Sequence, residues 1–362
     1  MRIALVGPTH PFKGGIAHHT TELAHKLKGE GHDVSLISWS SQYPSILYPG
    51  IQKVPDDKPE TAVFGDTSYP LSWKNPAGWV QVGKRLRKFD MVIFVFVTSI
   101  QAPAYLTMLK SLGKNFKGET IALCHNVLPH ERRFFDLPLT KAVLGKVDRL
   151  LVHTPSQASL AKTLTKAEIT MLEMPPHLPA TAKSKHSKAV TRHLLFFGMV
   201  RKYKGVDVLL RALAEVPDVT LTVAGEIWGG TEKYDQLMAE LGVADRVKLL
   251  SGYVPSQEIP KLFGEADALV LPYRSGTATQ NVTLAFAHGL PVVATTVGSM
   301  AKQVRNDKDG ILCSPDDVAD LAAAIKHLYE PGVLEKLRKN LPDVSGKEEW
   351  KIYIAGLVAE KS

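Results

Sequence analysis

The chain has 362 residues, of which 44% are hydrophobic and 22% are charged, and its formal net charge is +8. This length suggests about two domains, each large enough to bury a core, and the composition is that of a soluble globular protein. Only two cysteines are present, Cys124 and Cys313, so we predict two buried free thiols rather than a disulfide framework.

The first half alternates apolar strands with Gly-rich loops and helices. After "RIALVG", which predicts a strand, the loop "PTHPFKGG" leads into residues 16–32, whose apolar spacing is typical of an amphipathic helix. Further strands are expected at "DVSLIS", Met91–Val97, Thr120–Leu123 and Arg149–His153. This alternation implies a parallel sheet with helices on both faces.

The longest apolar stretch, residues 91–109, is long enough to cross a membrane. Thr98, Ser99, Gln101 and Pro103 interrupt it, so we interpret it as a buried strand, a polar loop and the start of a helix. The N-terminal residues carry one charge and a very short apolar run, which predicts a first strand and not a signal peptide. We therefore expect a cytoplasmic protein.

The pattern changes at residues 175–192, where Pro, Ser, Lys and Ala predominate and predict a linker. The alternation of strands and helices then starts again with the strand "HLLFFG" and the helix "GVDVLLRALAEV". Later strands are expected at "VTLTVAG", "RVKLLSG", "ALVLPY", "LPVVAT" and "GILC". The predicted parts of the chain are a first domain at 1–178, a linker at 179–192, a second domain at 193–345, and a C-terminal helix at 346–362 that packs back on the first domain.

Three loops have the features of phosphate-binding elements. In the first domain, Gly14 and Gly15 precede a helix, where glycine lets the backbone approach a ligand and the helix N-terminus favours anions. In the second domain, Arg201 and Lys204 precede a helix, and two cations there suit a diphosphate. The third loop, Thr277–Asn281, leads into the helix "VTLAFAHG". Because doubly wound sheets bind ligands at the carboxyl ends of their strands, we expect one cleft between the domains.

These segments carry a family resemblance that covers nearly the whole chain. "PFKGGIAHHTTELAHKL", "FFGMVRKYKGVDVLLRAL", "TVAGE", "LLSGYVPSQEIPKLFGEADALVLPYR" and "AFAHGLPVVATTVGS" resemble glycosyltransferase family 4. Members of that family are retaining, nucleotide-sugar-dependent enzymes of the GT-B fold. The resemblance implies an α/β protein with two Rossmann-like, doubly wound parallel-sheet domains that face each other across a cleft, and a reaction without a metal or other cofactor.

The resemblance also implies roles for individual residues. His125, in "CHNVLPHE", matches the family's active-site histidine near the transferred sugar. Arg201 and Lys204 would hold the donor diphosphate and stabilise the leaving group, because they place positive charge where negative charge develops. Tyr253 with its neighbour would border the base, and Glu226 either reaches the ligand or caps the turn after its strand. Beside these three catalytic residues, the expected substrate-binding set is Gly14, Gly15, Glu226, Tyr253, Val254, Thr277, Thr279, Gln280 and Asn281.

Two features depart from the family pattern. The family commonly places two glutamates eight positions apart in the third loop and its helix, and here those positions are Gly276 and Leu284. Leu284 cannot bind the ribose hydroxyls, as the second glutamate usually does. Met199 stands where the family often has an arginine, and the arginine has moved two positions further on. We expect residues 279–281 to supply hydrogen bonds through side chains and amides instead.

No metal site is predicted from the sequence. His10, His18, His19 and His130 lack a third ligand at a fixed spacing. The string Asp307–Asp309 has the DxD pattern that binds metal in a different glycosyltransferase fold, but it precedes a glycine and a short strand, so we interpret it as a surface turn.

We therefore predict a retaining glycosyltransferase that moves a hexose from a GDP- or UDP-hexose to a hydroxyl of a glycan or lipid-linked acceptor, in bacterial cell-envelope polysaccharide biosynthesis. Two alternatives stay open. A non-catalytic partner would keep the fold and support another transferase, which the missing glutamates favour. A dinucleotide-dependent oxidoreductase is opposed by the lack of a GxGxxG string and by the second complete Rossmann-like half.

The positive charge is concentrated in the first half. Residues 1–180 carry a net charge of +7 and residues 181–362 a net charge of +1. Lys84, Arg85, Arg87 and Lys88 form a tight basic group, which suits peripheral contact with an anionic membrane and equally describes a solvated helix face. We expect no nucleic-acid partner.

Overall fold

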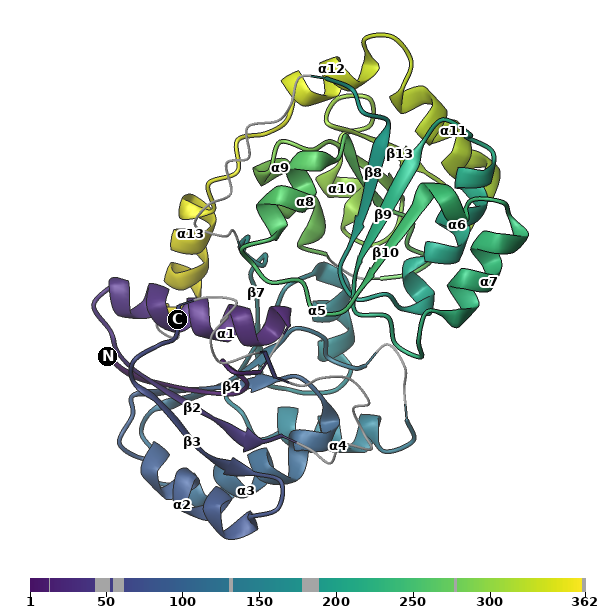
Figure 1. Ribbon diagram of the computed structural model, residues 1–362. Coiled ribbons are helices and arrows are strands. Elements are labelled where there is room, and N and C mark those ends of the chain that lie inside the picture. Colours follow the sequence, from purple (N-terminus) through teal and green to yellow (C-terminus); the bar gives the residue numbers. More distant parts are fainter. Residues whose placement is uncertain are drawn as a thin grey trace. The chain divides into compact units, whose positions relative to one another are not determined.

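The computed structural model describes residues 1–12, 14–42, 53–54, 62–129, 133–177, 189–276 and 279–359. It divides into two compact units. Unit 1 consists of Met1–His177 together with Lys347–Ser362, and unit 2 consists of Leu178–Gly346. Each unit is a doubly wound α/β domain with its own parallel sheet (Figure 1). The predicted fold class of two Rossmann-like domains is therefore confirmed.

Unit 1 contains a seven-stranded sheet in the order β3-β2-β1-β4-β5-β6-β7. Every pair of neighbouring strands is parallel. The strands are β1 (Arg2–Val6), β2 (Asp33–Ser41), β3 (Thr67–Ser72), β4 (Met91–Phe96), β5 (Glu119–Cys124), β6 (Arg149–Val152) and β7 (Glu168–Met171). The helices are α1 (Gly15–Gly29), α2 (Pro76–Leu86), α3 (Ala102–Leu112), α4 (Asp136–Leu144), α5 (Pro155–Lys162) and α13 (Lys347–Val358), with the 3-10 turn η2 (Ser99–Gln101).

Strand β4 shows why helices must cover both faces of this sheet. All six of its residues are buried, and successive side chains of a strand point to opposite faces. Met91, Ile93 and Val95 pack in one cluster with residues of α1 and α13. Val92 and Phe94 pack in another cluster with residues of α2, α3 and α4. Figure 1 shows α1 on one face and α2 and α3 on the other.

The apolar stretch at residues 91–109 folds as the sequence predicts. It forms β4, the turn η2 and most of α3. The hydroxyl of Thr98 accepts a hydrogen bond from the N–H of Ile100 and so caps the turn. Among the described residues, every helix is too short or too polar to span a bilayer.

The C-terminal helix α13 completes the core of unit 1. Trp350, Tyr353 and Leu357 are each at most 3% exposed. The guanidinium of Arg149 donates to the carbonyl of Leu357 at 2.7 Å and binds both carboxylate oxygens of Glu119 at 2.9 Å. Residues almost at the end of the chain therefore stabilise the sheet that its first residues begin.

Unit 2 contains a six-stranded parallel sheet in the order β10-β9-β8-β11-β12-β13. Its strands are β8 (His193–Phe197), β9 (Thr220–Gly225), β10 (Val247–Ser251), β11 (Ala268–Leu271), β12 (Val292–Thr295) and β13 (Gly310–Cys313). Its helices are α6 (Val206–Ala214), α7 (Glu232–Glu240), α8 (Ile259–Glu265), α9 (Asn281–Ala287), α10 (Met300–Gln303), α11 (Val318–Leu328) and α12 (Val333–Lys339), with the 3-10 turns η3 (Lys202–Lys204) and η4 (Ala244–Arg246).

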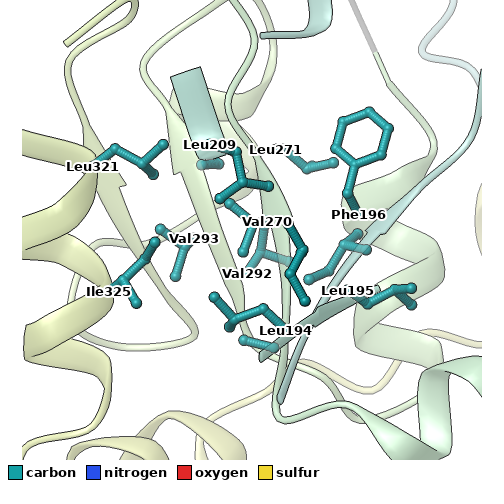
Figure 2. Packing of buried hydrophobic residues seen from close by; sticks show 14 of the residues in the cluster. Leu194, Leu195, Phe196, Leu209, Val270, Leu271, Val292, Val293, Leu321 and Ile325 are labelled. Carbon is teal, nitrogen blue, oxygen red and sulfur yellow. The ribbon is translucent and has the colours of Figure 1, made fainter. Parts of the chain in front are cut away.

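The core of unit 2 lies between its central strands and the helices that cover them. Figure 2 shows Leu321 and Ile325 of α11 beside Val293 of β12, and Val270 of β11 in the middle of the same cluster. Because the central strands are buried on both faces, they read as continuous apolar runs in the sequence. The predicted strands of this half are all present.

The two cysteines are buried free thiols, as predicted. Cys124 ends β5 in unit 1 and Cys313 ends β13 in unit 2. Burial raises the pKa of each thiol to about 12, because the thiolate would lose its hydration. Both side chains therefore act as small apolar groups at neutral pH.

Candidate active site

In unit 2, three strands bring polar groups to the same edge of the sheet. Gly198 follows β8, Glu226 follows β9, and Tyr273 lies two residues after β11. The carboxyl ends of parallel strands meet at one edge, where doubly wound sheets bind their ligands. The chain there is very tightly packed, because a Cβ atom on Gly225 would lie 2.3 Å from the carbonyl oxygen of Gly198. Glycine at position 225 is therefore required for β8 and β9 to end side by side.

The two predicted cations of this edge are held against aromatic rings. The guanidinium carbon of Arg201 lies 4.0 Å from the centre of the Trp228 ring, and the ammonium of Lys204 lies 5.3 Å from the centre of the Tyr273 ring. The indole N–H of Trp228 in turn donates to a carboxylate oxygen of Glu226 at 3.1 Å. Cation–π contacts of this kind hold the two basic groups in position.

Arg274 fastens the loop that carries these cations. Its guanidinium binds both carboxylate oxygens of Asp207 at 2.8 and 2.7 Å, and its Nε donates to Asp316 at 2.7 Å. It also donates to the backbone carbonyl of Lys202 at 2.9 Å. Although partial burial opposes the effect, the Arg274 hydrogen bonds hold the pKa of Asp207 below its usual value. The loop at residues 201–204 is thereby tied to α6 and to the end of β11.

The amide of Asn281 completes the cluster at the end of β8. Its Nδ2 donates to the carbonyl of Phe197 at 2.8 Å and lies 3.4 Å from the hydroxyl oxygen of Tyr273. A Cβ atom placed on Gly198 would lie 3.4 Å from this Nδ2 and 3.5 Å from Nζ of Lys204. An amide and an ammonium therefore flank the same short piece of backbone.

The structure describes only part of the rest of the predicted third loop. Thr277 lies outside the described residues. The hydroxyl of Thr279 accepts from the backbone N–H of Asn281 at 3.2 Å, and α9 begins at that asparagine. The side-chain Oε1 of Gln280 is buried and has no hydrogen-bond partner among the described residues. Such a buried acceptor is costly unless something else satisfies it.

Three other predicted positions lie near this edge in different environments. Tyr253 and Val254 follow β10 and are half-buried, and Val254 packs against the apolar core. Leu284 is 9% exposed and belongs to the same core. Its position on α9 therefore serves packing and offers no hydrogen bond to a ligand.

In unit 1, the predicted glycine loop leads directly into α1. Gly14 is the N-cap of the helix with a φ of 104°, a conformation that side chains other than hydrogen disfavour. Gly15 is exposed, and a Cβ atom there would meet nothing within 4 Å among the described residues. The fold thus explains glycine at position 14 but gives no packing reason for it at position 15.

His125 comes directly after β5 and lies among other histidines. Its ring is 5.0 Å from the ring of His19, edge to face, and 5.1 Å from the ring of His153. Burial and the nearby histidines hold the pKa of His125 well below its usual value, so the ring is neutral at pH 7. Its Nε2 is buried and has no hydrogen-bond partner among the described residues.

The same cluster extends through hydrogen bonds to α13. Nδ1 of His19 lies 3.0 Å from Nε2 of His177, and Nε2 of His19 lies 3.2 Å from the hydroxyl of Tyr353. Nδ1 of His177 lies 2.6 Å from Glu22. Burial first, and the neighbouring His177 second, lower the pKa of His18 to about 4. Several imidazoles are thus held neutral side by side at the carboxyl edge of the sheet.

Sequence reasoning missed the residues that hold these two clusters in place. In unit 2 they are Trp228 and Arg274, and in unit 1 they are His153, His177 and Tyr353. The polar string "PYR" after β11 was the one available signal for Arg274. The others come together only through contacts between segments far apart in the sequence, which no local pattern encodes.

The basic group of unit 1 divides into two kinds of residue. The guanidinium of Arg87 donates to the carbonyls of Ser111 and Leu112 and so joins α2 to α3. Lys84 and Lys88 are exposed. Arg87 therefore has a structural role, and only part of the group is available to an anionic surface.

Comparison with known proteins shows a family match over part of the chain. Residues 191–331 match the family model described as Glycosyl transferases group 1. The chain is 31% identical over 205 residues to the D-inositol 3-phosphate glycosyltransferase of Mycobacterium sp. (strain KMS), an alignment that covers 52% of this chain and 46% of that protein. The chain thus spans about half the length of the D-inositol 3-phosphate glycosyltransferases that it matches. It is also 25% identical over 371 residues to the glycogen synthase of Mycobacterium tuberculosis (strain ATCC 25618 / H37Rv), covering 91% of this chain and 86% of that one.

Solved structures share the fold over nearly the whole chain. A sucrose-phosphate synthase from Thermosynechococcus elongatus superposes with a TM-score of 0.70 at 18% identity, covering 98% of this chain and 96% of that one. Anabaena Alr3699/HepE in complex with UDP superposes with a TM-score of 0.70 at 15% identity, covering 98% and 100%. Residues 191–331 therefore resemble the Glycosyl transferases group 1 family, in a chain that has the two Rossmann-like domains of the GT-B fold.

Proposed function

We propose that this protein is a retaining glycosyltransferase that moves a hexose from a nucleotide diphosphate sugar to a hydroxyl of a glycan or lipid-linked acceptor. The observation that carries the proposal is the cluster at the end of β8, where Lys204 and Asn281 flank Gly198 and Arg201 follows three residues later. Two fixed cations and an amide at the carboxyl edge of a Rossmann-like sheet suit a diphosphate. The family match over the same residues supports this role.

In the proposed reaction, the bond between the sugar and the diphosphate breaks as Arg201 and Lys204 stabilise the charge that develops on the leaving phosphate. The acceptor hydroxyl attacks from the same face, assisted by that phosphate, which retains the configuration of the sugar. Gly15 would admit the donor's phosphate–sugar end, because a Cβ atom there would meet nothing within 4 Å among the described residues. His125 would offer a neutral Nε2 to a hydroxyl of the transferred sugar.

The donor base and the ribose contact are further parts of the proposal. Since Leu284 is part of the core, the loop at residues 279–281 has to replace the missing glutamate. The buried Oε1 of Gln280 is an acceptor of the right kind for a ribose hydroxyl. The Anabaena neighbours contain UDP or UDP-glucose, so a UDP-hexose is the first donor to test and a GDP-hexose the second.

A screen of UDP- and GDP-hexoses for hydrolysis and transfer tests this function. Arg201→Ala or Lys204→Ala should lower kcat by about 10²–10³-fold, the usual cost of removing one group that stabilises the developing charge. Lys202→Ala is the matched control, because Lys202 is exposed and contacts Arg274 through its backbone carbonyl, which alanine keeps. Full activity of both cluster variants would contradict the proposed clamp.

The same screen separates the enzyme from a non-catalytic partner, which the loss of both glutamates favours as the alternative. A thermal shift with UDP or GDP together with turnover supports the enzyme. A nucleotide shift with no hydrolysis and no transfer, for any donor or acceptor, would replace the proposal by that of a partner protein. A shift with NAD alone would support the oxidoreductase instead.

We further propose that the acceptor lies at an anionic membrane surface, which would place this protein at the cytoplasmic face and in cell-envelope polysaccharide synthesis. The support is the net charge of +7 in residues 1–180 and the exposed Lys84 and Lys88. Cosedimentation with anionic vesicles at low salt tests it, with neutral vesicles as the control. Equal recovery with both kinds of vesicle would rule out this localisation.

A further inference from the structure

We propose that unit 1 contains a binding site for Zn²⁺ formed by His18, Glu22 and His177. Each of these residues offers one ligand atom, and the three atoms lie within 4.8 Å of one another. His18 and Glu22 are four residues apart on α1, which places them on one face of the helix. His177 comes from the segment after β7, so the third ligand is supplied by residues more than 150 positions away.

The distances fit a site that needs only small rotations to close. Oε2 of Glu22 lies 3.7 Å from Nε2 of His18 and 2.6 Å from Nδ1 of His177. The two imidazole centres are 5.1 Å apart. In a tetrahedral zinc site with bonds of about 2.0–2.2 Å, neighbouring ligand atoms are roughly 3.3 Å apart. The distance from Glu22 to His18 is therefore about 0.4 Å longer than this value, and the distance from Glu22 to His177 is about 0.7 Å shorter. The ligand atoms of His18 and His177 lie within 4.8 Å of one another.

The ring of His177 is oriented by a further layer of hydrogen bonds. Its Nε2 lies 3.0 Å from Nδ1 of the buried His19, whose Nε2 lies 3.2 Å from the hydroxyl of Tyr353. A metal-binding histidine usually has its second nitrogen held in this way, which fixes the ring and its tautomer. The arrangement directs Nδ1 of His177 toward Glu22.

The chemistry of the three ligands selects the metal. Two imidazole nitrogens and one carboxylate suit Zn²⁺, whereas Ca²⁺ and Mg²⁺ prefer oxygen ligands alone. The side chains of His18, Glu22 and His177 are 21%, 17% and 6% exposed, so solvent reaches the site from the His18 side. Three protein ligands leave a fourth position for water from that side.

Two other groups of side chains, one in each unit, show what sets this cluster apart. The ammonium of Lys26 lies 4.0 Å from Oε1 of Glu22, the oxygen that the proposed site does not use, and it would weaken cation binding. In unit 2, His327 also contacts two carboxylates, but it does so through opposite nitrogens, with Nδ1 on Glu330 and Nε2 on Asp307. That arrangement cannot chelate a single ion, so His327 is a matched control.

The proposed ion would bind where the chain leaves unit 1. His177 is the last residue of the first segment of that unit, and α1 is packed against α13, the segment that returns to it. Zinc there would join α1 to this exit point. The inference does not depend on the proposed glycosyl transfer.

Calorimetric titration of the metal-free, untagged full chain with ZnCl₂ at pH 7 tests the site. The expected result is one Zn²⁺ per chain, with at least tenfold weaker binding in Glu22→Gln and in His18→Ala. Glu22→Gln keeps the size of the side chain and one acceptor oxygen for His177, so it separates loss of a ligand from loss of folding. His327→Ala should bind as the unmodified chain does, and Lys26→Met should bind more tightly.

Binding of Co²⁺ provides a second, spectroscopic test of the same site. Co²⁺ in place of Zn²⁺ should give the intense visible absorption of a tetrahedral complex, and that absorption should be lost in Glu22→Gln. Absence of saturable zinc binding by the unmodified chain would overturn the proposal. Undiminished binding by both variants, or weakening by His327→Ala, would overturn it equally.

Discussion

The two units build opposite electrostatic environments on the same architecture. At the carboxyl edge of the unit 2 sheet, the basic side chains of Arg201 and Lys204 lie against aromatic rings, and Arg274 is held by two carboxylates. At the corresponding edge of the unit 1 sheet, His19 and His125 are buried and neutral at pH 7. A doubly wound sheet therefore supplies the place for a site, while the residues after each strand decide its charge.

The clusters of the two units also differ in the sequence separation of the residues that form them. The cations and amide of unit 2 come from residues 201–281, and the Arg274 ion pairs extend this only to Asp316. The histidine cluster of unit 1 runs from α1 to Tyr353 near the end of the chain. Unit 1 should therefore depend on its last helix in a way that unit 2 does not.

The largest effect is expected from removing the buried side chain of Tyr353 in α13. Tyr353→Ala should lower the free energy of unfolding of unit 1 by about 3–5 kcal/mol, because Tyr353 is 1% exposed and packs in the core. Ile352→Ala is the matched control, since Ile352 lies in the same helix and is 60% exposed. Hydrogen exchange in urea, followed for peptides of β4 and β11, assigns the loss to a unit. Equal effects of the two variants, or a loss confined to β11, would contradict the dependence on α13.

The second effect is the pH dependence of stability that buried or ion-paired histidines cause. It has opposite signs for His153 in unit 1 and His327 in unit 2. Burial lowers the pKa of His153 to about 4, against about 6.5 in an unfolded chain. Its contribution to stability is present above pH 6.5 and is lost as the pH falls toward 4, by roughly 3 kcal/mol in all. Hydrogen bonds to Glu330 and Asp307 raise the pKa of His327, so its small contribution is present at low pH and is lost as the pH rises.

His153→Gln tests the acid sensitivity of unit 1. The glutamine keeps a donor for the carbonyl of Leu172, which Nδ1 of His153 contacts at 3.1 Å, but it cannot take up a proton. Urea unfolding of unit 1 between pH 7 and pH 4 should then depend less steeply on pH, by close to one proton. His327→Gln in unit 2 is the control and should leave this slope unchanged. An unaltered slope in His153→Gln would show that other groups cause the acid sensitivity.

The smallest expected effect concerns the loop that carries the cations of unit 2. Arg274→Met should cost about 1–2 kcal/mol of unit 2 stability, because it removes the charge-assisted hydrogen bonds of a side chain that is 24% exposed. If the loop positions Arg201 and Lys204 for a donor, the Arg274→Met substitution should also raise KM for that donor. Lys261→Met is the control, since Lys261 is 78% exposed in its ion pair with Glu265. Unchanged donor kinetics in Arg274→Met would show that the loop is ordered without this arginine.

Most of the fold could be predicted because its signals are local. The apolar runs of β4, β8 and β11 and the helix α11 have the lengths and periodicities that define buried strands and amphipathic helices. The glycine loop before α1 and the cations before α6 were visible for the same reason. Leu284 was recognised as unable to bind ribose, but only the packing of α9 shows why leucine stands there.

The amino-acid sequence by itself determined the two Rossmann-like domains, the buried thiols and the positions of the loops that carry charge. Only the tertiary structure decided that His18, Glu22 and His177 meet, and that Arg274 fastens the loop before α6. The physical reason is the range of the interactions. Helices and strands follow from the spacing of apolar residues over a few neighbouring positions. Chelating clusters and ion pairs form instead where packing brings distant segments within a few ångströms.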